Sequence, residues 1–78
     1  MNNSEKYKKV FSTTFEMKNN FDEKLEYNSI EAWDSIGHMN LISNLEEEFK
    51  ISLETDDIVD FSSFNKGKEI LKKYKISF

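Results

Sequence analysis

The 78-residue sequence contains no cysteine, no proline and only two glycines. Without cysteine the chain has neither a disulfide framework nor a zinc-type cluster of Cys and His ligands. No apolar run approaches the roughly 20 residues of a membrane-spanning helix, and no signal-peptide pattern opens the chain. We therefore expect a cytoplasmic protein without a membrane span.

Length and composition indicate one small folded domain, residues 1–78. Hydrophobic residues make up 37% of the chain and aromatic residues 14%, enough for a compact core, so disorder is not expected. Burial at this size supplies only a few kcal/mol of net stability, which leaves no room for an internal catalytic cleft. We expect a monomer that is not an enzyme.

Charge is segregated along the chain. Residues 1–20 carry +2, residues 21–60 carry −10 and residues 61–78 carry +4, for a net charge of −4. An acidic middle repels nucleic-acid phosphates, and it favours docking onto basic patches of partner proteins. We therefore expect protein partners and no nucleic acid.

The spacing of apolar residues predicts an all-α fold with four helices. The first runs from Ser4 to about Phe15, with Ser4 or Asn3 as its cap, and the second from Ser35 to about Phe49. The third runs from Asp56 to about Asp60, after a cap at Glu54 or Thr55, and the fourth runs to about Tyr74 after a cap at Ser62 or Ser63. In the short third helix, Ile58 and Val59 are expected to point inward. The loop after the first helix is long, with a helical turn near Asp22–Glu26, and the core anchors expected in it are Phe21, Leu25, Tyr27, Ile30 and Trp33.

The helix from Ser35 to Phe49 carries the most specific signal. Asp34 is a good N-cap residue, so Ser35 takes the first helical position, with its hydroxyl at the positive end of the dipole. The predicted core face consists of Met39, Leu41, Ile42, Leu45 and Phe49. The opposite, solvent-facing side consists of Ile36, Asn40, Ser43 and Glu47. Acids at positions 46–48 stand at the helix end that the dipole disfavours, which favours recognition over stabilisation as their role.

The segment Asp34-Ser35-Ile36, followed by an apolar stripe that closes on Leu45-Glu46-Glu47-Glu48-Phe49, resembles the attachment helix of acyl and peptidyl carrier proteins. The likeness extends from about Ile30 to Tyr74. In that family the serine of an Asp-Ser-Leu motif carries a 4′-phosphopantetheine arm from coenzyme A, whose thiol holds cargo as a thioester. Since this chain has no cysteine, any thiol it uses must arrive on such a group.

The resemblance implies a four-helix bundle of the acyl-carrier type, with a long loop between the first two helices and a short third helix. It implies that Ser35 is the attachment residue and that Asp34 helps to bind the magnesium of a phosphopantetheinyl transferase. The carrier would present an acyl or aminoacyl group to loading and transferring enzymes. The implied partner surface consists of Ile36, Asn40, Ser43, Glu47, Asp56, Asp57 and Asp60.

Three positions on the second helix depart from fatty-acid synthase carriers. Gly37 and Asn40 stand where those carriers commonly have acids, and Ser43 stands where an apolar contact is usual. These departures favour a specialised biosynthetic pathway. Gly37 itself is explained either by room for the arm or a partner, or by tolerance of glycine in a first turn.

Other functional classes remain open. One is an unmodified helical interaction module in which Ser35 only caps its helix; another is a helix-turn-helix DNA binder, against which Glu69 and the acidic middle argue.

His38 follows Ser35 by three residues, but no third residue is placed to orient it, so a half-buried packing histidine is expected rather than a hydrolase. The three aspartates of the third helix lack the spacing, glycine and distal glutamate of a calcium loop, and indicate a solvated acidic face.

Overall fold

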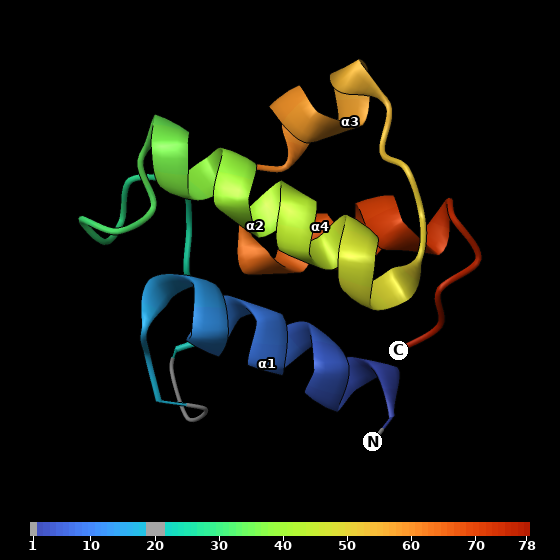
Figure 1. Ribbon diagram of the computed structural model, residues 1–78, viewed down its shortest axis with the longest axis horizontal. Helices are drawn as coiled ribbons and strands as arrows, with labels where there is room; N and C mark the ends of the chain where they lie inside the picture. Colours follow the sequence, from blue (N-terminus) through green and yellow to red (C-terminus); the bar gives the residue numbers. More distant parts are fainter. Residues whose placement is uncertain (1, 19–21) are drawn as a thin grey trace.

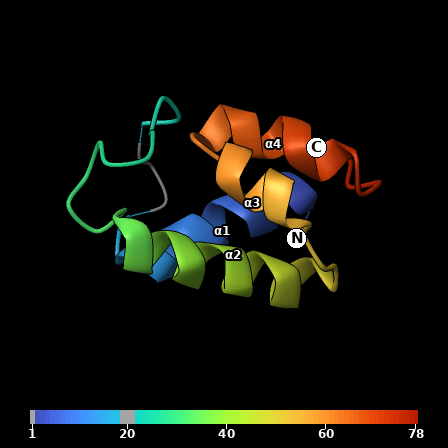
Figure 2. The ribbon, with the colours of Figure 1, turned by 90° about the horizontal axis from the view of Figure 1, so that it is seen from above.

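The computed structural model describes residues 2–18 and 22–78. These residues form four α-helices and no strand: α1 (Asn3–Phe15), α2 (Ser35–Phe49), α3 (Thr55–Asp60) and α4 (Phe64–Lys72). Figure 1 shows α1 and α2 side by side, with α3 at the top. Seen from above, α2 and α4 lie on opposite sides with α1 and α3 between them (Figure 2). The all-α prediction is confirmed; within the described ranges, no helix has the length and apolar character needed to cross a membrane.

The predicted bounds and cap of α2 are confirmed. The Asp34 carboxylate oxygen Oδ1 accepts a hydrogen bond of 2.8 Å from the backbone N–H of Gly37. At the other end, Lys50 adopts a left-handed conformation with a φ of 54°, and its N–H reaches the carbonyl of Glu46. The Glu46 carboxylate also accepts the N–H of Leu53 at 2.7 Å. Glu46 therefore stabilises the turn after α2, whereas the sequence predicted a recognition role for this acid.

Helix α1 starts one residue earlier than predicted, because its cap is Asn2 and not Asn3 or Ser4. The Asn2 side-chain oxygen accepts the backbone N–H of Glu5 at 2.8 Å. Asn3 has a different contact: its side-chain amide donates to the carbonyl of Ser77 at 2.9 Å. This hydrogen bond joins the two ends of the chain.

The two C-terminal helices follow the prediction with small shifts at their ends. Helix α3 begins after Glu54, which makes no side-chain capping hydrogen bond. Helix α4 is capped by Ser63, whose hydroxyl accepts the N–H of Lys66 at 2.9 Å. It ends at Lys72, two residues before the predicted Tyr74.

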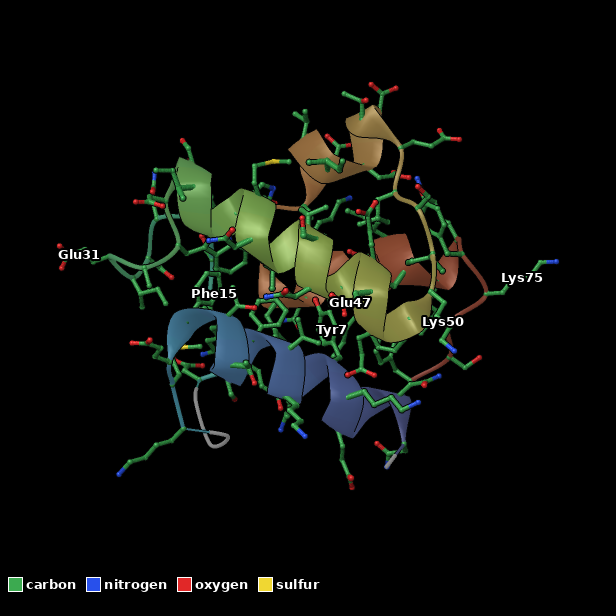
Figure 3. The ribbon with its side chains drawn as sticks, viewed as in Figure 1. Tyr7, Phe15, Glu31, Glu47, Lys50 and Lys75 are labelled. Atoms are coloured by element: carbon green, nitrogen blue, oxygen red, sulfur yellow. The ribbon has the colours of Figure 1, made fainter. Side chains whose placement is uncertain are left out.

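Aromatic rings form the centre of the core. The fully buried Phe11 of α1 lies 5.0 Å from Tyr7, 5.5 Å from Trp33 and 5.1 Å from Phe64, measured between ring centroids, with each pair edge-to-face. Such pairs contribute about 0.5–1.5 kcal/mol each beyond their buried area. Figure 3 shows Tyr7 and Phe15 in the space between α1 and the helices above it. The rings hold α1, α4 and the loop before α2 together.

Two residues predicted to face the core from helices are exposed. Met39 of α2 is 52% exposed and Val59 of α3 is 74% exposed, so both predictions were wrong. Ile58, predicted to point inward, is half-buried against the core. The helical period correctly placed Leu41, Ile42 and Leu45 on the buried face of α2, whereas the buried residue of the six-residue α3 is Asp57.

The segment between α1 and α2 is irregular in its described part. Leu25 and Trp33 are buried as predicted and Ile30 is partly buried, whereas Phe21 lies outside the described residues. Tyr27 is 37% exposed, so its prediction as a core anchor was wrong. Near Asp22–Glu26 the chain forms a hydrogen-bonded turn and no helix. An isolated β-bridge between Glu26 and Ser63 then ties this segment to the start of α4.

Gly37 lies where α2 touches the loop that precedes it. A Cβ atom at this position would stand 2.0 Å from the carbonyl oxygen of Ala32 and 3.3 Å from a ring carbon of Phe15. The chain therefore needs glycine here for a close contact within itself, which is neither of the two explanations left open by the sequence.

We expect Gly37→Ala to destabilise the protein. Alanine gains up to about 1 kcal/mol of helix propensity, but the collision is with backbone that cannot rotate away, and such overpacking costs typically about 1–3 kcal/mol. Urea unfolding should therefore give a lower midpoint than the wild type. Ser43→Ala, on the exposed side of the same helix, is the control and should stay within about 0.5 kcal/mol. A midpoint for Gly37→Ala at or above that of the wild type would contradict this account.

Candidate functional site

The hydroxyl of Ser35 is exposed at the first position of α2. Because the Asp34 carboxylate makes the capping hydrogen bond, the Ser35 side chain has no part in the cap. Its oxygen lies 3.1 Å from the hydroxyl of Tyr27, in the loop before the helix. Ser35 is thus placed at the electropositive end of a helix with its oxygen accessible from solvent.

A groove with a volume of about 350 Å³ opens beside Ser35. Its apolar lining comes from Met39 of α2, Ile58 and Val59 of α3, and Phe61, which follows α3. Its polar lining comes from Tyr27, Ser35, His38 and Ser62. An accessible hydroxyl therefore stands at the edge of a largely apolar groove between α2 and α3.

His38 holds the two sides of this groove together. The indole N–H of Trp33 donates to Nδ1 of His38 over 3.0 Å, and Nε2 of His38 lies 2.8 Å from the carbonyl oxygen of Ile58. Since an indole N–H can only donate, Nδ1 is the acceptor, and Nε2 carries the hydrogen given to Ile58. The half-buried packing histidine predicted from sequence is confirmed. Both of its nitrogens are engaged away from Ser35, which leaves neither to act as a base toward that hydroxyl.

The sequence predicted a solvated face for the three aspartates of α3, and this prediction was wrong for Asp57. Asp57 is only 6% exposed, and its carboxylate accepts hydrogen bonds of 2.5 Å from the Lys73 ammonium and from the Tyr74 hydroxyl. The end of α4 folds over this side of α3, which the period of a six-residue helix does not reveal. Asp57 is therefore too buried to belong to the predicted partner surface, whereas Asp56 and Asp60 are exposed.

These contacts shift the pKa values of all three groups. The hydrogen bond from Lys73, followed by that from Tyr74, holds the pKa of the Asp57 carboxyl below its usual value. The same hydrogen bonds raise the pKa of Lys73 and of Tyr74. The Tyr74 hydroxyl also accepts the backbone N–H of Glu54 at 3.0 Å, so the cluster connects the residue before α3 to the end of α4.

The remaining predicted partner residues are exposed on α2. Ile36 is 74% exposed, and Asn40, Ser43 and Glu47 are also exposed. They do not form one site: Glu47 lines a second groove of about 420 Å³ between α1 and α2, at the end of α2 away from Ser35 (Figure 3).

Sequence reasoning missed the groove residues other than Ser35. Tyr27 was interpreted only as a loop anchor, and Phe61 and Ser62 were given no role near the serine. Each reaches the site through tertiary contacts, such as the hydrogen bond of 2.9 Å from the Tyr27 N–H to the Ser62 carbonyl. No local pattern in the sequence carries that information.

None of the family models, curated proteins or solved structures compared with the chain matches it.

We expect Asp57→Asn to lower stability in a pH-dependent way. The substitution keeps the side-chain shape and removes the charge. Because the folded-state pKa of Asp57 is lowered, its stabilisation is present above the ordinary aspartate pKa and is lost as the pH falls through the lower folded value. The difference in melting temperature between wild type and variant should therefore narrow from about pH 7 to about pH 2.

Asp56→Asn, at the exposed neighbouring position, controls for the change in net charge. A constant difference for Asp57→Asn across this pH range, or one that matches the control, would show that the Asp57 contacts contribute no stability.

Proposed function

We propose that the protein is a carrier that holds its cargo as a thioester on a 4′-phosphopantetheine group attached to Ser35. The observation that carries the proposal is the exposed Ser35 hydroxyl at the start of α2, beside an apolar groove and free of the capping role, which Asp34 fills. A helix N-terminus favours a phosphate by about 0.3–1 kcal/mol through its dipole.

The arrangement of helices supports the same proposal. The 15-residue α2 follows a long segment that is irregular in its described part, and the six-residue α3 then separates α2 from α4. This order is that of the acyl-carrier type of four-helix bundle, which the resemblance of residues 30–74 implies. We infer that the chain is a bundle of that type.

The residues beside Ser35 fit the chemistry of the proposed group. Attachment of its phosphate needs an accessible hydroxyl, which Ser35 offers. Its arm alternates methyl and methylene groups with a hydroxyl and two amides, and the groove beside Ser35 is lined by both apolar and polar side chains. When bound, the group supplies the thiol that a chain without cysteine lacks. Met39, Ile58, Val59 and Phe61 are the apolar side chains placed to contact it.

Loading would need a phosphopantetheinyl transferase and coenzyme A. The Ser35 oxygen forms a bond to the phosphorus that bears pantetheine, and the bond from this phosphorus to the second phosphate of coenzyme A breaks. Adenosine 3′,5′-bisphosphate leaves, and the serine proton passes to the transferase or to water. Asp34 stands next to the reacting hydroxyl and would help to bind the magnesium of the transferase.

The cargo-handling partners would meet the exposed residues near Ser35. Ile36, Met39 and Val59 expose apolar side chains around it, and exposed apolar clusters are typical of interaction sites. Asn40 and Ser43 extend this surface along α2, and Asp56 and Asp60 extend it over α3, whereas Glu47 would meet a partner at the second groove, between α1 and α2. We propose enzymes that load and transfer acyl or aminoacyl groups in a specialised biosynthetic pathway, while the carrier itself catalyses no step.

Incubation with coenzyme A and a promiscuous transferase tests the proposal. The wild type should gain the mass of one phosphopantetheine group, and Ser35→Ala should gain none. Ser62→Ala is the matched control, because it removes the other serine hydroxyl of the groove and should load like the wild type. Failure of the wild type to load, or loading of Ser35→Ala, would refute the carrier and leave an unmodified interaction module as the proposal.

Asp34→Asn separates the two roles of the capping residue. Asparagine caps helices as well as aspartate, so thermal stability should stay within about 0.5 kcal/mol. Loss of the charge should slow loading by about tenfold or more, equivalent to at least about 1.4 kcal/mol in the barrier. The readout is the initial rate of mass gain at fixed transferase concentration. An unchanged rate would restrict Asp34 to its structural role.

A further inference from the structure

Tyr27 contacts the proposed attachment residue directly. Its hydroxyl lies 3.1 Å from the Ser35 oxygen and lines the same groove. Tyr27 as a whole is 37% exposed. It is a neutral donor beside the atom that would carry the phosphate.

Backbone contacts on both sides fix the position of this tyrosine. Its own N–H donates to the carbonyl of Ser62 over 2.9 Å, and the N–H of the following Asn28 donates to the carbonyl of Trp33 over 2.9 Å. The ring packs edge-on against Trp33 and His38, with centroid distances of 6.4 Å and 5.6 Å. Since these contacts do not involve the Tyr27 hydroxyl, they can persist when Ser35 is modified.

The surrounding charges increase the need for such a donor. The sequence has no lysine or arginine from position 25 to position 49, and the lining of the groove includes none among the described residues. The carboxylate of Asp34, the residue before Ser35, would repel a phosphate on Ser35. A phosphate on Ser35 must therefore rely on neutral donors, and a hydrogen bond to a charged acceptor is about twice as strong as one between neutral groups.

We propose that Tyr27 is the positioning residue of the modified site: its hydroxyl donates to the phosphate on Ser35 and holds that phosphate at the edge of the groove. The proposal rests on the carrier function. A phosphate on the Ser35 oxygen brings non-bridging oxygens next to the atom that Tyr27 already reaches. The tyrosine thus exchanges a hydroxyl partner for an anionic one without moving its ring.

The test compares loaded wild type with loaded Tyr27→Phe. The variant keeps the ring and its packing and loses only the hydroxyl. It should load to completion, and its phosphorus NMR signal should shift away from that of the wild type toward that of a loaded Ser35 peptide in water. Tyr74→Phe is the control: it removes a tyrosine hydroxyl that contacts Asp57 outside the groove, and should leave the phosphorus signal at the wild-type position.

A second measurement uses the wild type alone, so that it does not depend on the folding of a variant. The chain has three tyrosines, and labelling of their Cζ carbons gives one signal for each. On loading, the Tyr27 signal should move while those of Tyr7 and Tyr74 stay in place. Loaded protein in which the Tyr27 signal is unmoved, or in which Tyr27→Phe leaves the phosphorus signal unchanged, overturns the inference alone. Failure of the wild type to load overturns it together with the carrier proposal.

Discussion

The structure around the site depends on the pairing of one buried donor, the indole N–H of Trp33. The ring is fully buried, and an unpaired N–H there would cost about 1–3 kcal/mol. His38 accepts it and passes a second hydrogen bond to the carbonyl of Ile58. Two hydrogen bonds and one ring thus connect the loop, α2 and α3. Because these are the segments that line the groove, its shape follows from the pairing of Trp33.

Helix α3 shows why polar contacts decide this part of the fold. Six residues form too short a helix to persist alone, and Val59 is left exposed, so apolar burial contributes little. The helix is held near its end by His38 at the Ile58 carbonyl and near its start by Asp57 and Tyr74. Both contacts reach elements distant in sequence. The position of α3, which forms the side of the groove away from Ser35, therefore depends on these polar contacts.

The difference between contacts within one segment and contacts between distant segments explains what the sequence could predict. The bounds of α2 follow from a cap and a period read within one segment, so Asp34 and Ser35 were placed correctly. The exposure of Met39 and the burial of Asp57 depend on how far α3 and the end of α4 extend over their neighbours, which no local period encodes. The groove partner Tyr27 was missed for the same reason, since its contacts with Ser62 and Ser35 are set by the fold.

The surface beside Ser35 combines two kinds of interaction. The apolar side chains of Ile36, Met39 and Val59 lie close to the proposed attachment point, whereas Asp56 and Asp60 carry charge along α3. Burial of apolar area supplies affinity. Exposed charge mainly raises the association rate, and high salt screens this effect. Under the carrier proposal, the partner enzymes bind the protein and release it within one turnover, which requires fast encounter with modest affinity. A small apolar patch beside exposed acids fits that requirement, and the proposed partner would carry an apolar centre with a basic rim.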